Sequence, residues 1–323
     1  MYYVTLIVAA LVTNASGQST LRFDIFEEEQ VPDTVADILR MSGLRDKYPP
    51  AEVATLSLEI APLDNNQHTY FSISTTGMLL VSARLDRDII CPNQADCQIN
   101  LDIQVQPFNY FEIVKVELTI MDKNDNTPSF GGTGQVRLPV LEGPVTGLPQ
   151  SLPQATDPDS PAYSIAEYAI SGQSNTFRLE TFTGSDGSKE PLLQVLVPLD
   201  RETEDGYSLI LYAIDNGSPR KTGSVIVLID VQDANDEYPV FTQQAYEQTI
   251  SEELTSGAYV ITVMATDRDV GTNADVTYAF ADSTEQNILE AFQIDATSGM
   301  LTSVALMSIF YYTKRLGNIG GIR

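Results

Sequence analysis

The fold is decided by the segment Asp122-Lys123-Asn124-Asp125-Asn126-Thr127-Pro128-Ser129-Phe130. About 110 residues later the chain repeats this pattern as Asp233-Ala234-Asn235-Asp236-Glu237-Tyr238-Pro239-Val240-Phe241. Each copy places an Asp-x-Asn-Asp cluster just before a Pro-x-Phe segment, which is typical of a strand start. The repetition predicts tandem copies of one structural unit, with an acidic connector at each boundary.

A second set of acidic residues follows the same period. Glu28 precedes Asp86 by 58 residues, and Glu142 precedes Asp200 by the same distance. Each of these aspartates opens an acidic triplet, and the two triplets are Asp86-Arg87-Asp88 and Asp200-Arg201-Glu202.

An Asp-x-Asp pair is present in the second and third copies, as Asp157-Pro158-Asp159 and Asp267-Arg268-Asp269. The first copy reads Gly43-Leu44-Arg45 at the corresponding place. Because the first unit has no predecessor, we infer that the pair serves a site shared with the unit before it. The acidic residues should therefore meet at the junctions between units.

These residues supply the carboxylate, amide and carbonyl oxygens that calcium prefers. The chain has two cysteines and one histidine, His68, which are too few for a tetrahedral zinc site. Magnesium is the less favoured alternative, because it rarely uses an all-protein cage so rich in carboxylates. An EF-hand is excluded, since Thr127 stands where that loop requires glycine and Thr133 where it requires a bidentate glutamate.

The composition is that of an acidic, folded protein. Its 323 residues carry a formal charge of −26 and are 43% hydrophobic, which is enough for packed cores in two or three domains. The charge argues against nucleic acid or an anionic membrane surface as a partner. The apolar stretch from Tyr2 to Val12, with small residues before Gln18, predicts a secretory signal peptide, and a buried first strand is the alternative. No later segment approaches the roughly 20 apolar residues of a membrane span.

Cys91 and Cys97 are the only cysteines of the chain. In the oxidising compartment that a signal peptide implies, we expect them to form a disulfide, with a free buried pair as the alternative. The small loop that this bond closes would shape local structure rather than define the fold.

Strand patterns dominate the rest of the chain. Apolar and polar residues alternate from Ile99 to Val105, from Val114 to Ile120 and from Val225 to Val231. The one expected helix is short and lies around Gln286 to Ala291. An all-β fold of antiparallel sandwiches follows.

Taken together, these motifs resemble the repeats of the cadherin family over about 290 residues. The resemblance also includes the segment Ala213-Ile214-Asp215-Asn216-Gly217-Ser218-Pro219. The spacing Cys91-x5-Cys97 resembles a loop of the protocadherin subgroup. The chain has no tryptophan, which disfavours the cadherins that dock by swapping an N-terminal strand carrying tryptophan. The resemblance implies tandem Greek-key, immunoglobulin-like β-sandwiches, that is, cadherin repeats joined by calcium-binding linkers.

The resemblance implies the calcium ligands residue by residue. At the first junction they are Glu28, Asp86, Asp88, Asp122, Asn124, Asp125, Asp157, Asp159 and Asp215, with carbonyl oxygens from Lys123 and Asn126. At the second junction they are Glu142, Asp200, Glu202, Asp233, Asn235, Asp236, Asp267, Asp269 and Asn273. Asp88 stands where the family usually has glutamate, which shortens that ligand by one methylene.

The acidic connectors also predict the domain boundaries. We expect a signal peptide at 1–17, repeats at 18–126 and 127–237, a partial third repeat at 238–306 and a divergent tail at 307–323. The repeat pattern is lost where Ser308-Ile309-Phe310 stands in place of an acidic triplet, which indicates a truncated isoform or an incomplete gene model.

The function that the resemblance implies is calcium-dependent cell–cell adhesion, with like cadherin molecules as partners in cis and in trans. The expected location is extracellular, at the plasma membrane for a full-length parent. A secreted fragment that acts as a soluble ligand or decoy is the alternative. Catalysis is not expected, because acids shared at junctions lack a pocket, and neither a small-molecule substrate nor nucleic acid is expected.

Overall fold

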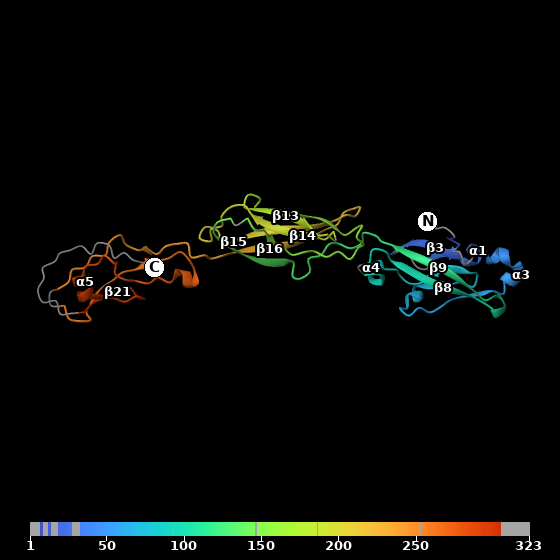
Figure 1. Cartoon of the computed structure of the whole chain (residues 1–323), viewed down its shortest axis with the longest axis horizontal. Helices are drawn as coiled ribbons and strands as arrows, with labels where there is room; N and C mark the ends of the chain where they lie inside the picture. The colour runs from blue at the N-terminus through green and yellow to red at the C-terminus, as the bar shows by residue number, and fades with distance from the viewer. Residues whose placement is uncertain are drawn as a thin grey trace.

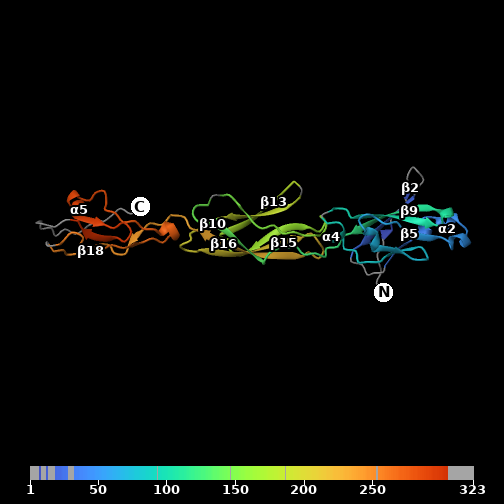
Figure 2. The same ribbon diagram turned by 90° about the horizontal axis from the view of Figure 1, so that it is seen from below.

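In the computed structural model the chain forms three β-rich units that lie end to end along one axis, in sequence order (Figure 1). The view turned by 90° shows the same narrow, extended shape (Figure 2). The structure describes residues 7–8, 12–13, 19–27, 33–92, 94–145, 147–185, 187–251 and 254–304. Over these segments, no helix has both the length and the apolar character needed to cross a membrane.

The first unit is a sandwich of two sheets around one apolar core. In the larger sheet β3 (Ser19–Phe26) runs parallel to β9 (Glu112–Met121), which pairs antiparallel with β8 (Gln98–Gln106). Every second residue from Ile99 to Val105 is buried, because successive side chains of a strand point to opposite faces. The other elements are β4 (Asp33–Asp37), α1 (Ile38–Met41), α2 (Leu44–Lys47), α3 (Pro50–Val53), β5 (Ser57–Ile60), the 3₁₀ helix η1 (Gln67–Tyr70), β6 (Phe71–Ile73), β7 (Met78–Val81), α4 (Arg87–Ile90) and the 3₁₀ helix η2 (Phe108–Tyr110).

Two strands of two residues each lie within the segment predicted to be a signal peptide. β1 (Ile7–Val8) and β2 (Val12–Thr13) both pair antiparallel with β3. The cleavage of residues 1–17 stays a prediction.

The second unit repeats this architecture. β10 (Gln135–Leu141) runs parallel to β16 (Thr222–Gln232), as β3 runs parallel to β9. β16 pairs antiparallel with β15 (Gly206–Asp215), and β15 with β12 (Ile165–Ser171). An apolar core lies between this sheet and a second one, made of β11 (Gln150–Ser151), β14 (Lys189–Val195) and β13 (Phe177–Thr183).

The third unit begins as a copy of the second. Ala265 N donates to Tyr278 Oη at 2.9 Å, as Ala155 N donates to Tyr168 Oη at 2.9 Å. Between residues 238 and 304, as far as they are described, no hairpin corresponds to β15 and β16, and the apolar side chains form two separate clusters. The elements are β17 (Val240–Phe241), β18 (Tyr259–Thr262), β19 (Ala265–Thr266), the 3₁₀ helix η3 (Gly271–Ala274), α5 (Gln286–Ala291), β20 (Phe292–Ile294) and β21 (Met300–Ser303).

The all-β fold predicted from the sequence is confirmed. The three alternating segments lie within β8, β9 and β16, and the expected short helix coincides with α5. The helices α1 to α4 were not expected. Each has four residues, and two of them begin at an aspartate cap: Asp37 Oδ1 accepts from Arg40 N, and Asp86 Oδ1 from Ile89 N, both at 3.1 Å.

Candidate metal-binding junctions

The connector between the first two units is surrounded by acidic side chains from both of them. Because β3 and β9 run parallel with Phe26 opposite Met121, the next residues, Glu27 and Asp122, leave the sheet at the same edge. The second unit contributes residues from the loop before β12 and from the end of β15. We call this group the first junction, and it comprises Glu27, Asp86, Asp88, Asp122, Asn124, Asp125, Asn126, Asp157, Asp159 and Asp215.

Glu27 is fully buried at this junction and is fixed by two backbone groups. Its Oε2 accepts a hydrogen bond from Arg87 N at 2.6 Å, and its Oε1 accepts one from Lys123 N at 2.9 Å. Carboxylate oxygens of Glu27, Asp86 and Asp88 lie within 4.8 Å of one another. The three side chains therefore form one set of oxygens that a single ion could contact.

A second set of three carboxylates joins the two units. Oxygens of Asp88, Asp122 and Asp159 lie within 4.8 Å of one another. The side-chain amide of Asn126 donates to Asp88 Oδ2 at 2.6 Å and to Asp159 Oδ1 at 2.8 Å. Ser160 N donates to Asp122 Oδ2 at 2.6 Å. Asp88 thus belongs to both sets and links them.

Two further predicted ligands, Asp215 and Asn124, are also held by hydrogen bonds. Asp215 is fully buried, and its Oδ1 accepts from Gly217 N at 2.9 Å and from Lys221 N at 3.0 Å. The Asn124 amide donates to Pro219 O at 2.9 Å. These bonds fix one polar atom of each side chain and leave the other atom for a ligand.

Among the described residues, five buried oxygens at the first junction have no hydrogen-bond donor. A buried acceptor without a partner costs about 1–3 kcal/mol, so five of them in one group call for a bound partner, and a cation would satisfy all five. All are carboxylate or amide oxygens, the donors that hard divalent cations take. They are Asp122 Oδ1, Asn124 Oδ1, Asp157 Oδ2, Asp159 Oδ2 and Asp215 Oδ2.

The electrostatics of the first junction favour a bound positive charge. Burial raises the pKa of Glu27 to about 7, although the hydrogen bonds from Lys123 and Arg87 oppose the shift. Burial, together with the charges of Asp122 and Asp159, raises the pKa of Asp88 to about 6. Ionised carboxylates are thus disfavoured here by burial and by one another, and a cation would reverse both effects.

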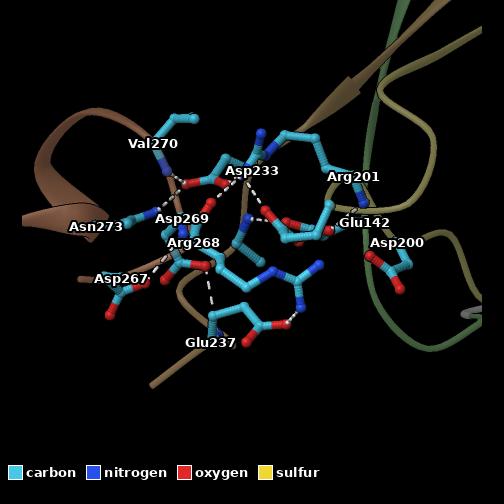
Figure 3. A network of polar contacts seen from close by, with 12 residues as sticks. Glu142, Asp200, Arg201, Asp233, Glu237, Asp267, Arg268, Asp269, Val270 and Asn273 are labelled. Carbon is cyan, nitrogen blue, oxygen red and sulfur yellow. Dashed lines mark hydrogen bonds and ion pairs between the residues drawn. The ribbon is translucent and has the colours of Figure 1, made fainter. Parts of the chain in front are cut away.

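The second junction lies between the second and third units (Figure 3). Glu142 repeats the contacts of Glu27: its Oε2 accepts from Arg201 N at 2.6 Å and its Oε1 from Ala234 N at 2.7 Å. Carboxylate oxygens cluster here in the sets Glu142, Asp200, Glu202 and Glu202, Asp233, Asp269, each within 4.8 Å. We define the second junction as Glu142, Asp200, Glu202, Asp233, Asn235, Asp236, Asp267, Asp269 and Asn273.

Asp233 lies at the centre of the second junction in Figure 3. Its Oδ1 pairs with Arg201 Nε at 2.6 Å, and its Oδ2 accepts from Val270 N at 3.1 Å and from the Asn273 amide at 3.0 Å. Burial raises the pKa of Asp233, but these three hydrogen bonds outweigh it and leave the pKa below its ordinary value. Arg201 also pairs with Glu202.

The third unit supplies Asp267 and Asp269. Asp269 is buried, its Oδ1 accepts from Glu237 N at 3.3 Å, and its Oδ2 has no donor in the described part of the chain. Asp267 Oδ1 accepts from Asp269 N at 3.0 Å. Burial raises the pKa of Asp269, and the charges of Asp267, Asp233 and Asp236 add to the shift. Asn235 and Asp236 are exposed.

Comparison with protein families decides what kind of repeat this is. Residues 138–232 match the family model described as cadherin domain, and residues 20–107 match the model described as cadherin-like. The chain is also similar to the solved structure of mouse clustered PcdhgC3 EC1-3, with a TM-score of 0.77, 30% identity and 89% of each chain covered. The chain belongs to the cadherin family.

Protocadherins are among its relatives in sequence. The chain is 35% identical to protocadherin gamma-A4 of Pan troglodytes over 303 residues, which are 94% of this chain and 31% of the relative. It is 33% identical to protocadherin gamma-A12 of Homo sapiens over 290 residues, 90% of this chain and 30% of the relative. The structure of protocadherin gamma B2 extracellular cadherin domains 1-5 gives a TM-score of 0.78 at 29% identity, covering 88% of this chain and 52% of that one. The cadherin repeats described here thus span about a third of the length of these curated relatives.

Glu27 is a candidate ligand that the sequence motifs did not indicate. The spacing of 58 residues pointed to Glu28, which lies outside the described residues, whereas the structure places Glu27 where Glu142 lies in the second repeat. The alternation of β3 is the signal that could have found it, because Glu27 continues the buried face of Phe23 and Ile25. Glu142 likewise follows Val140 on the buried face of β10.

Proposed function

We propose that calcium ions bind at both junctions and hold consecutive cadherin repeats as one stiff rod. The observation that carries the proposal is the group of five buried, donor-free oxygens at the first junction, contributed by the connector and by the second repeat. Without an ion, a connector this rich in carboxylates repels itself and bends. With ions, both repeats share the same ligands and their relative orientation is fixed.

The ligands fall into the sets that the geometry suggests. One ion would contact Glu27, Asp86 and Asp88, and another would contact Asp88, Asp122 and Asp159. Asn124, Asp157 and Asp215 add the remaining donor-free oxygens. At the second junction the corresponding sets are Glu142, Asp200, Glu202 and Glu202, Asp233, Asp269.

The biological role we propose is calcium-dependent homophilic cell adhesion at the plasma membrane. Its support is membership of the cadherin family and the end-to-end row of repeats (Figures 1 and 2). Like molecules on two cell surfaces would pair in trans and neighbours on one surface in cis. Weak single contacts between them would gain strength from multivalent display.

Thermal unfolding of the full chain during a calcium titration tests the proposal. We expect saturable stabilisation at calcium concentrations near the millimolar range of extracellular modules. The double variant D125A, D236A should need more calcium for the same stabilisation. Beads coated with the chain should aggregate in calcium and disperse in chelator. A chain whose stability and shape are the same in calcium and in chelator would contradict the proposal.

A further inference from the structure

The arginine in the middle of each acidic triplet behaves differently at the two junctions. The backbone positions are equivalent, because Arg87 N donates to Glu27 and Arg201 N donates to Glu142. The two guanidinium groups nevertheless lie in different surroundings. The position of each guanidinium determines how much positive charge the protein places among the carboxylates of that junction.

Arg87 is directed into the loop closed by the disulfide between Cys91 and Cys97. Its Nη2 donates to the carbonyl oxygen of Gln94 and reaches that of Ala95 at 3.4 Å, and its side chain is 2% exposed. Among the described residues of the junction, the guanidinium contacts Asp88 alone, from Nη1 to Oδ1 at 3.2 Å. Two backbone carbonyls outside the junction thus share this guanidinium.

Arg201 has no such loop to enter. Three residues separate Glu202 from the start of β15 at Gly206, whereas nine residues separate Asp88 from the start of β8 at Gln98. The guanidinium turns into the second junction, where it pairs with Asp233 and Glu202 and donates from Nη2 to Arg268 O at 2.9 Å. Two of the carboxylates that would bind an ion are therefore already paired with a cation of the protein.

We propose that the Cys91–Cys97 loop is a positioning element that withdraws the Arg87 guanidinium from the first junction and leaves its carboxylates to calcium. This inference rests on the proposed function. At the second junction, the Arg201 guanidinium is itself paired with the carboxylates, and calcium must displace it to bind them. Because two cations cannot occupy one set of carboxylates without repulsion, the guanidinium and calcium compete for them.

A double-mutant cycle at the first junction tests the inference. Calcium affinity is measured by calorimetry on the full chain carrying D233N and D269N, which remove two carboxylates of the second junction. In this background C91S/C97S should lower the affinity of the first junction about tenfold, which corresponds to about 1.4 kcal/mol. When R87M is also present, C91S/C97S should leave the calcium affinity nearly unchanged, because no guanidinium is left to enter the junction.

Each other outcome overturns the inference. Unchanged affinity in C91S/C97S would show that Arg87 stays withdrawn without the loop. Equal losses with and without R87M would show that the loop acts on folding rather than through the arginine. If C91S/C97S does not fold, reduction of the folded chain with dithiothreitol, with and without R87M, gives the same comparison. A parent chain that binds no calcium would overturn the proposed function. Calcium binding that is the same with and without C91S/C97S would overturn only this inference.

The second junction supplies a comparison within the same chain. R201M should raise calcium affinity there by more than R87M raises it at the first junction. Equal effects of the two substitutions would mean that the disulfide loop makes no difference to where the charge acts.

Discussion

The side-chain amide of Asn126 donates to Asp159 Oδ1 at 2.8 Å and to Asp88 Oδ2 at 2.6 Å, so one side chain touches a carboxylate of each repeat. Both of these carboxylates lie in the same proposed ion site. The groups that would bind calcium are therefore the groups that determine how the second repeat sits on the first. Binding and stiffness should change together when any of them is altered.

Asp159 offers the most direct test of this coupling. D159N removes a carboxylate that the second repeat contributes, and we expect calcium affinity at the first junction to fall about tenfold or more. Burial raises the pKa of Asp159, so the variant should be at least as stable as the parent without calcium. Thermal unfolding with and without calcium measures both effects. D64N, at an exposed loop position, is the control and should behave as the parent.

The assignment of Glu27 can be separated from that of its neighbour. E27Q places its amide NH2 against the backbone N–H of either Arg87 or Lys123, a donor–donor mismatch that should cost about 1–3 kcal/mol and weaken calcium binding. E28Q should leave stability and binding unchanged. Calorimetry on the two variants decides the question, and the reverse result would return the ligand to Glu28.

The response to pH should have opposite signs with and without calcium. The pKa of Glu27 is raised to about 7, and those of Asp88 and Asp157 to about 6, so the folded chain binds protons more tightly than the unfolded chain. Their contribution to stability without calcium is therefore fully present below about pH 4 and is lost as the pH rises through 6 to 7. Calcium needs the ionised form, so calcium affinity should fall as the pH drops from about 8 to 5.

Thermal unfolding across that pH range, with calcium and after its removal, measures both trends. A calcium affinity that stays constant from pH 8 to pH 5 would contradict the assignment of these carboxyls to the site. Other acids add to the total stability, so the comparison is made between E27Q and the parent, in which only the Glu27 contribution differs.

Gly223 tests how closely the start of the second repeat, at Pro128, packs against β16. A Cβ atom at this position of β16 would overlap the backbone carbonyl oxygen of Pro128, which cannot move without displacing the connector. We expect G223A to destabilise the second repeat by about 1–3 kcal/mol, as overpacking does elsewhere. S224A, at the exposed neighbouring position, should have little effect. Chemical denaturation compares the two, and equal stabilities would contradict the close contact.

Much of the fold could be predicted because each long strand buries one face. The alternation in β8 and β16 appears directly in the sequence, and the repeat period then places the acids at the junctions. The helices α1 to α3 could not be predicted in this way. Four residues are barely one turn, so no period of 3.6 can be read from them.

The choice of ligands was harder to predict than their region. Glu27, Glu28 and Glu29 are chemically identical neighbours, and only the register of β3 decides which one faces the junction. The directions of Arg87 and Arg201 depend on the length of the following loop and on what it offers as an acceptor. Which glutamate faces the junction and where each arginine points depend on packing in three dimensions. Residue spacing along the chain does not reveal that packing.

The first and last strands of a repeat run parallel, and their common direction determines where the chain enters and leaves the repeat. Because β3 and β9 point the same way, as do β10 and β16, the chain enters every complete repeat at one pole and leaves at the other. Each added repeat of this kind therefore begins at the pole where the previous one ends. The length of a row of such repeats is therefore proportional to the number of repeats in it.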